Sequence, residues 1–226
     1  MKLLLSTKNS IRSLSGRIID IWHVGSILLV VKILINKVLL VLLGFKIVCV
    51  FQKEANVRFV NYHDCKMELY HLHKDEMDEL YQMENSDISN RDKDYFDKSS
   101  EYIDCYVSKL NGRITGYYFV NNRLLDVPEV NIKLRLPPLT FYIFKCFVFR
   151  GYRKRGIYTA ALLRINRLKF QNNFRASFIC ASPTNIAAIK GNERVGFRKI
   201  GRCWTIQKGP FRKSFNNFER RCLNLL

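Results

Sequence analysis

The segment from Leu139 to Ala161 constrains the fold of this chain more than any other. It begins with an apolar, aromatic and β-branched run, Phe141 to Phe149, which is typical of a buried strand. A short basic loop with two glycines follows, and apolar residues at helical spacing begin at Ile157. The segment therefore predicts a strand, a loop and a helix, in that order.

The loop between these two elements has the composition of an anion-binding turn. Arg153, Lys154 and Arg155 stand directly before Gly156, which opens the helix. The first turn of a helix has backbone N–H groups without partners inside the helix, and it carries the positive end of the helix dipole. Such a turn binds phosphate oxygens, and arginine adds bidentate contacts. An ordinary basic surface loop fits the same residues, since the loop matches neither the Walker pattern nor G-x-G-x-x-G.

A second segment downstream favours the first of these interpretations. Asn185-Ile-Ala-Ala188 opens another predicted helix, which ends at Gly196-Phe197. Together the two segments resemble the signature of the GNAT superfamily of N-acetyltransferases, which is Gln/Arg-x-x-Gly-x-Gly/Ala followed by Asn-x-x-Ala and Gly-Phe. The first part is present here as Arg153-Lys-Arg-Gly156-Ile-Tyr158. The resemblance covers residues 57–206.

The resemblance implies a fold and a cofactor site. The fold is α/β (α+β), with a GNAT-like mixed, mostly antiparallel sheet flanked by helices. Acetyl-coenzyme A is expected against the central strand, where a bulge near Phe147 and Val148 separates two strands. Its pyrophosphate is expected on the backbone N–H groups of residues 154–158. The cofactor-binding residues that the resemblance implies are Phe147, Val148, Phe149, Arg153, Lys154, Arg155, Gly156, Ile157, Tyr158 and Asn185.

Two positions depart from the family pattern. The final Gly/Ala of the first motif is Tyr158 here, and the tyrosine that often serves as general acid is replaced by Asn192. The thiolate of coenzyme A needs a proton when it leaves the acetyl group. Asn192 cannot donate one as a tyrosine would, so the candidate donors are a water molecule and Tyr158. The attacking amine has to lose a proton as well. The candidate residues for removing the proton of the amine are Glu129, with Asp126 nearby, and Tyr142 on the central strand.

The implied function is acyl-coenzyme A-dependent transfer of an acetyl group to a primary amine. The R-x-x-G-I-Y pattern, the leucine-rich helix and the apolar N-terminal helix look similar to family members in bacterial surface-polysaccharide synthesis. An amino sugar is therefore the expected acceptor. The alternative is a catalytically silent GNAT-like module that binds a membrane or another polyanion through its basic half. Nucleic acid is not an expected partner, because the sequence holds no recognised nucleic-acid-binding motif.

Charge divides the chain into three parts. The formal net charge is +19, of which residues 1–60 contribute +7 (9 basic, 2 acidic), residues 61–110 contribute −7 (6 basic, 13 acidic) and residues 111–226 contribute +19 (23 basic, 4 acidic). A basic C-terminal half attracts phosphate-bearing ligands such as coenzyme A, and also anionic surfaces. The seven cysteines are scattered and odd in number. They predict a reducing, cytoplasmic environment and neither a disulfide framework nor a metal site.

The N-terminal part contains a strongly apolar segment, residues 26–43, which predicts a helix ended by Gly44. Lys32, Asn36 and Lys37 form a polar stripe on this helix and make its insertion into a bilayer roughly neutral in free energy. The alternatives are packing against the domain or a second subunit, contact with the inner membrane surface, and a true span. The first two fit the polar stripe better than a span does.

We expect three parts in this chain. Residues 1–52 form the basic N-terminus and the apolar helix, residues 53–210 form the acyltransferase domain, and residues 211–226 form a basic tail.

Several other segments have clear local patterns. Residues 45–51 and 57–62 predict strands, and residues 66–83 predict a helix from their apolar spacing. Two β-rich runs flank Asn111-Gly112, which is the strongest short signal for a hairpin. Residues 121–138 predict a variable connection that leads into the central strand.

Overall fold

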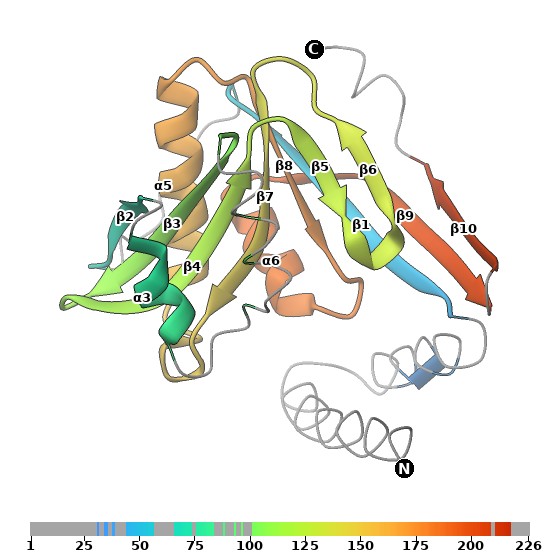
Figure 1. Ribbon diagram of the computed structural model, residues 1–226, viewed down its shortest axis with the longest axis horizontal. Helices are drawn as coiled ribbons and strands as arrows, with labels where there is room; N and C mark the ends of the chain where they lie inside the picture. The colour runs from blue at the N-terminus through green and yellow to red at the C-terminus, as the bar shows by residue number, and fades with distance from the viewer. Residues whose placement is uncertain are drawn as a thin grey trace. The chain divides into compact units, whose positions relative to one another are not determined.

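An eight-stranded sheet organises the chain in this computed structural model (Figure 1). Its strands are β1 (Lys46–Glu54), β2 (Glu68–Leu72), β3 (Ile103–Leu110), β4 (Arg113–Asn121), β7 (Thr140–Val148), β8 (Ala176–Ala181), β9 (Arg198–Lys208) and β10 (Phe211–Asn216). They lie in the order β10-β9-β1-β8-β7-β4-β3-β2. Strands β7 and β8 are parallel, whereas β1–β8, β2–β3, β3–β4 and β4–β7 are antiparallel pairs. The predicted mixed, mostly antiparallel sheet is therefore confirmed.

The structure describes the part of the chain that carries this sheet almost completely. The described residues are 31, 34, 35, 38, 44–56, 66–73, 76–83, 88, 93, 96, 101–208 and 211–217. The chain divides into one unit of Met1–Lys46 with Thr205–Lys213, and a larger unit of Ile47–Trp204 with Ser214–Leu226. The larger unit contains the predicted cofactor site.

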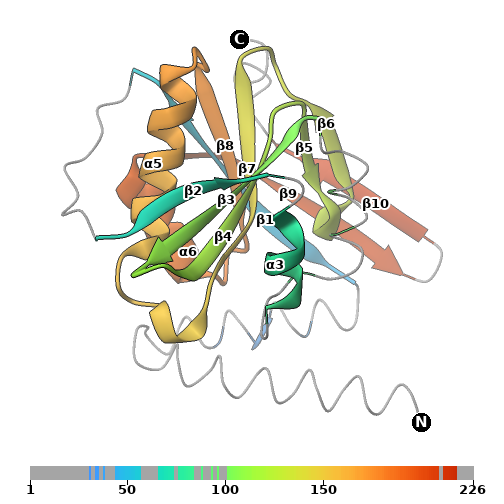
Figure 2. The same ribbon diagram turned by 60° about the vertical axis from the view of Figure 1, so that its left-hand side comes forward.

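Helices cover one face of the sheet in the larger unit, and a short helix and a hairpin cover the other (Figures 1 and 2). On the first face, α5 (Ile157–Gln171) and α6 (Ile186–Val195) pack against strand residues such as Phe141 and Ile179. On the second face lie α3 (Met77–Gln82) and the two-stranded sheet of β5 (Leu124–Val127) and β6 (Ile132–Arg135). Alternate residues of each strand point to opposite faces, so Tyr142 packs under the β5–β6 hairpin while Phe141 faces α5.

The β3–β4 hairpin forms where the Asn-Gly pair predicted it. Asn111 and Gly112 have φ angles of 51° and 76°. A tight two-residue turn needs positive φ at both central positions, and asparagine and glycine tolerate this better than other residues. The sequence pattern and the local structure therefore agree at this turn.

Strand β1 occupies an interior position in the sheet, although it comes first among the described strands. It lies between β8 and β9, and its pairing with β8 runs from Cys49↔Ala181 to Glu54↔Ala176. Val50 and Phe51 are completely buried, one on each face. The domain boundary that we expected between residues 52 and 53 falls inside this strand. The expected tail, residues 211–226, begins with strand β10.

The prediction of one helix over residues 66–83 is wrong. This segment forms β2, which pairs with β3 from Glu68↔Lys109 to Leu72↔Cys105, and then the six-residue helix α3. Pairing with the edge of β3 outweighs the helical spacing of the apolar residues, as tertiary context often outweighs local propensity. Residues 121–138 likewise hold more structure than we expected, because they form the β5–β6 hairpin.

Two other predictions concern residues that are mostly or wholly outside the described part. The strand predicted at 57–62 lies outside it. In the predicted helix 26–43, residues 31, 34, 35 and 38 are described, and all four are helical. Among the described residues, no helix is both long and apolar enough to cross a bilayer.

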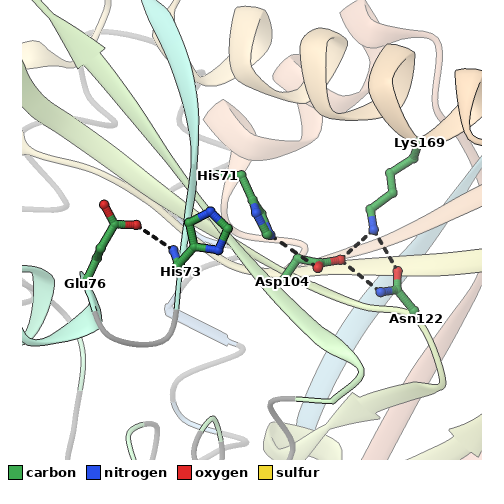
Figure 3. Close-up of polar contacts among 6 residues, drawn as sticks. All are labelled: His71, His73, Glu76, Asp104, Asn122 and Lys169. Atoms are coloured by element: carbon green, nitrogen blue, oxygen red, sulfur yellow. Dashed lines mark hydrogen bonds and ion pairs between the residues drawn. The ribbon is translucent and has the colours of Figure 1, made fainter.

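An ionic network holds the C-terminal end of α5 against the ends of β2, β3 and β4 (Figure 3). The ammonium group of Lys169, a residue only 7% exposed, donates to Asp104 at 2.5 Å and to Asn122 at 3.1 Å. The Asn122 amide also donates to Asp104, at 2.9 Å, and His71 Nε2 lies 3.3 Å from the second carboxylate oxygen. Burial raises the pKa of Asp104, but Lys169, Asn122 and His71 outweigh it and hold this pKa below the ordinary 3.8.

Replacing Asp104 by Asn should lower the free energy of unfolding at pH 7 by about 1–3 kcal/mol, because a buried ammonium loses its carboxylate partner. The folded pKa of Asp104 is depressed. Its contribution is therefore full above the ordinary carboxyl pKa and is lost as the pH falls through the folded value. Urea unfolding at pH 7 and pH 3 should show the difference between wild type and D104N shrinking at pH 3.

The control for this variant is Glu101→Gln. Glu101 is exposed, so its replacement should cost about 0.5 kcal/mol or less. If the difference in the free energy of unfolding between wild type and D104N stayed constant from pH 7 to pH 3, the stabilising role of the ionised Asp104 carboxylate would be contradicted.

Candidate active site

The central feature of the site is the separation of β7 from its parallel neighbour β8. The ladder between them runs from Thr140↔Ala176 to Ile143↔Ile179, whereas β7 continues to Val148. Figure 1 shows the two arrows diverging toward their C-terminal ends. The C-terminal half of β7 thus borders a wedge between two strands, which can accept the amide groups of an extended ligand along its backbone.

A bulge in β7 lies directly after the point of separation. Tyr117 pairs with Phe147 and Phe119 pairs with Phe144, so three steps along β7 match two steps along β4. Lys145 has a φ of 46°, in the left-handed region that non-glycine residues seldom adopt. A bulge bends its strand and increases its twist, which is what turns β7 away from β8. The bulge at Lys145 therefore lies two residues before Phe147 and three before Val148, close to the predicted position.

The loop after β7 lies where the sequence predicts an anion-binding turn. It contains the single-turn helix η3 (Arg150–Tyr152), and Lys154 and Gly156 have φ angles of 63° and 77°. Gly156 is the N-cap of α5. No described side chain caps this helix, and its first turn, which is fully described, holds no acidic residue. The open helix start, the positive-φ turn and the basic side chains together suit the phosphates of coenzyme A.

The basic side chains of this loop differ in what they contact. Arg153 Nε donates to the carbonyl oxygen of Val148 at 3.0 Å, and its guanidinium carbon lies 5.5 Å from the ring centre of Phe147. Arg155 lies 5.7 Å from the ring centre of Tyr152. Arg153 therefore holds the loop onto the end of β7. The exposed Lys154 lies between these two anchored residues.

Tyr158, in the first turn of α5, reaches across to α6. Its hydroxyl donates to Asn192 Oδ1 at 2.8 Å, and its ring lies against Gly191. A Cβ atom at Gly191 would stand 2.8 Å from two ring carbons of Tyr158, closer than packed carbon atoms approach. Burial, followed by the proximity of Cys146 and Tyr118, raises the pKa of Tyr158 well above 10. The phenol therefore carries its proton at neutral pH.

Asn185 has a clear structural task at the start of α6. Its side-chain oxygen accepts a hydrogen bond from the backbone N–H of Ala188 at 3.1 Å, which caps the helix. The side chain is exposed. Its additional role in binding the cofactor stays a prediction.

Glu129 and Tyr142 lie on the side of the sheet covered by the β5–β6 hairpin. Tyr142 is 4% exposed, and burial first, then Cys180 and Glu129, raises its pKa well above 10. Glu129 is exposed in η2 (Pro128–Val130), the turn between β5 and β6. The structure thus brings both residues to the same side of the sheet, opposite Tyr158. Their catalytic role stays a prediction.

Sequence reasoning missed three residues of this site. Tyr118 stands opposite the bulge, Cys146 follows it on the face toward α5, and Gly191 makes room for the ring of Tyr158. The unusual tyrosine at position 158 was the available signal, since a large side chain at that position requires a small residue nearby. Only the packing of α5 on α6 identifies that residue as Gly191.

The comparisons with known proteins agree with this geometry. Residues 66–197, more than half of the chain, match the profile of the Acetyltransferase (GNAT) family. The chain belongs to this family. Membership makes residues 66–197 an acetyltransferase domain of a family that uses acetyl-coenzyme A. No curated protein matches the sequence.

Solved structures show the same fold at low sequence identity. A GNAT-family acetyltransferase from Colwellia psychrerythraea is 15% identical, with a TM-score of 0.51 over 72% of this chain and 56% of that chain. A conserved protein of unknown function from Staphylococcus epidermidis is 12% identical, with a TM-score of 0.50 over 77% of this chain and 66% of that chain. This chain thus spans under two thirds of the length of each of these two proteins.

Gly156→Val should weaken the binding of coenzyme A by about tenfold or more. A β-branched residue at a φ of 77° is strained, and its branches would keep phosphates away from the backbone N–H groups. Isothermal titration should show a larger effect for this change than for replacing Arg153, Lys154 or Arg155 singly by Ala.

Gly112→Val is the matched control, because Gly112 has nearly the same φ, 76°, in the β3–β4 turn. It carries the same backbone strain but should leave the affinity for coenzyme A unchanged. Equal weakening by both variants would show that general strain, and not the loop, determines the effect.

Proposed function

We propose that this protein moves an acetyl group from acetyl-coenzyme A to the primary amine of an amino sugar. The observation that carries the proposal is the wedge between β7 and β8, which ends at an uncapped helix start with three basic residues before it. The helix start and the basic loop hold the phosphates, and the backbone of β7 beyond the bulge holds the pantetheine arm. A backbone N–H at the bulge stabilises charge on the acetyl oxygen. Acetyl-coenzyme A supplies the activated acetyl group.

The acceptor approaches from the side of the sheet that carries the β5–β6 hairpin. Aromatic rings line this side along β4 and β7: Tyr142 and Phe144 stack with centres 5.6 Å apart, and Tyr117 and Phe147 stack at 5.3 Å. Phe144 and Phe147 are half-buried, whereas Tyr117 and Tyr142 are buried. Aromatic walls with a few polar groups are usual in sites for small ligands, and they suit the apolar face of a sugar ring. Glu129, exposed beside Tyr142, takes the proton of the amine in this proposal.

The charge of the chain supports an acceptor that carries phosphate. Residues 111–226 have a net charge of +19 (23 basic, 4 acidic), more than the phosphates of one coenzyme A require. A nucleotide-linked or lipid-linked amino sugar would be attracted by the excess.

Acetyl transfer can be measured as release of free coenzyme A thiol during incubation with acetyl-coenzyme A and a panel of amines. We expect release with 2-amino sugars and their nucleotide-linked forms, and little with lysine peptides or polyamines. Glu129→Gln should reduce kcat and leave the affinity for acetyl-coenzyme A unchanged. Preference for peptides or polyamines would overturn the amino-sugar acceptor.

Thermal unfolding with coenzyme A separates the enzyme from a catalytically silent module. Ligand at about 100 times its Kd should add roughly 2.7 kcal/mol to the free energy of unfolding. Absence of any shift at millimolar coenzyme A would favour the silent module.

We also propose that the protein is cytoplasmic and attaches to the inner membrane surface through residues 26–43. Val31, Leu34, Ile35 and Val38 are helical and 45–54% exposed. Their spacing places them on one face of a helix. An apolar face with lysines in the same segment suits a position at an anionic membrane surface, and also an interface between two subunits.

Membrane fractionation followed by an alkaline carbonate wash tests this attachment. We expect the protein in the membrane pellet before the wash and in the supernatant after it. Leu34→Asp with Ile35→Asp should move it to the soluble fraction from the start. Protein that stays in the pellet after the wash would indicate an integral span, and a wild type that is soluble throughout would favour the subunit interface.

A further inference from the structure

The ring of Tyr158 lies between the phosphate loop and the bulge. It starts from the helix turn that follows the loop, and its centre is 6.5 Å from that of Tyr118, which stands opposite the bulge in β7. Cys146, next to the bulge, is close enough to affect the phenol electrostatically. The tyrosine therefore stands beside the part of β7 along which the proposed function places the pantetheine arm and its thioester.

Asn192 contacts the hydroxyl of Tyr158 through its side-chain amide. The residue is completely buried, and its Oδ1 accepts the hydroxyl of Tyr158. Its Nδ2 has no hydrogen-bond partner among the described residues. A buried amide donor without a partner is costly, so such a group often marks a site that completes its hydrogen bonds during function.

The chemistry of acetyl transfer requires a proton at the sulfur. When the amine nitrogen bonds to the acetyl carbon, the carbon–sulfur bond breaks and its electron pair stays on sulfur. A thiolate that forms away from water is unfavourable unless a donor meets it. The nitrogen loses one proton and the sulfur gains one, so amine and thioester become amide and thiol.

We propose that Tyr158 gives its proton to the sulfur of departing coenzyme A, and that Asn192 positions it for this step. The inference rests on the proposed function. The phenol hydrogen turns from Asn192 Oδ1 to the sulfur, where a charged acceptor makes the stronger hydrogen bond. A half-turn of the Asn192 amide then brings Nδ2 to the phenol oxygen and stabilises its negative charge. Tyr158 recovers a proton from solvent as the products leave.

The residues around Tyr158 fit its role as a proton donor. The tyrosine ring fits only because position 191 is glycine, and its hydroxyl then meets Asn192, one residue further along α6. Because burial raises its pKa, Tyr158 carries its proton at neutral pH and is available as a donor. Tyr158 is thus the catalytic residue of this step, and Asn192 is a positioning residue.

The test uses the full chain with coenzyme A and measures the pKa of the bound thiol. Thiolate formation is followed by ultraviolet difference absorbance between the complexes with coenzyme A and with desulfo-coenzyme A. A hydrogen bond from Tyr158 favours the thiolate, so Tyr158→Phe should raise the pKa of the bound thiol by about one to two units. Tyr106→Phe is the matched control, since Tyr106 is a buried tyrosine on the same face of the sheet and should leave this pKa unchanged.

A double variant covers the case in which Y158F folds poorly because Asn192 loses its partner. Tyr158→Phe with Asn192→Leu replaces both polar groups by apolar ones of similar shape, and it should show the same rise. Turnover of both variants should fall by about a hundredfold while the Kd for coenzyme A changes little.

The outcomes separate the two proposals. An unchanged thiol pKa in Y158F with coenzyme A bound overturns the role of Tyr158. Failure of the wild-type protein to bind coenzyme A overturns the proposed function itself.

Discussion

The pairing of β7 with β8, and its end after Ile143, is the constraint on which the rest of the site depends. A parallel ladder holds the first half of β7 in the centre of the sheet, and the bulge at Lys145 turns the second half away. Because the helix start of α5 follows directly, one short stretch of chain places a wedge, a bulge and the predicted anion-binding turn in sequence. The phosphate binding and acyl transfer that we propose thus depend on a single local distortion of the sheet.

Strand β1 belongs to the same sheet, although it lies outside the region that matches the family profile. The profile covers residues 66–197, yet β1, at residues 46–54, fills the interior position between β8 and β9. Its buried side chains contribute to the core on both faces of the sheet. The cooperative folding unit therefore includes residues that family similarity alone would leave out.

The contact between α5 and α6 shows how two departures from the family pattern compensate each other. A large residue at position 158 would collide with α6 if position 191 had a side chain, and Gly191 removes that collision. The hydroxyl then needs a partner inside the protein, which Asn192 provides. The two departures, Tyr158 and Asn192, thus meet in one hydrogen bond between α5 and α6.

The sequence alone determined the elements whose signals are local. The strand, basic loop and helix at 139–161, the hairpin at Asn111-Gly112 and the helix at 186–195 follow from periodicity, turn residues and caps. These signals act within a few residues, so no tertiary contact is needed to recognise them.

The tertiary structure decided the features that depend on pairing partners. The segment at 66–83 becomes a strand because β3 offers an edge. The bulge depends on the register between β4 and β7, and the pairing of Tyr158 with Asn192 depends on how α5 packs against α6, which no spacing in the sequence encodes.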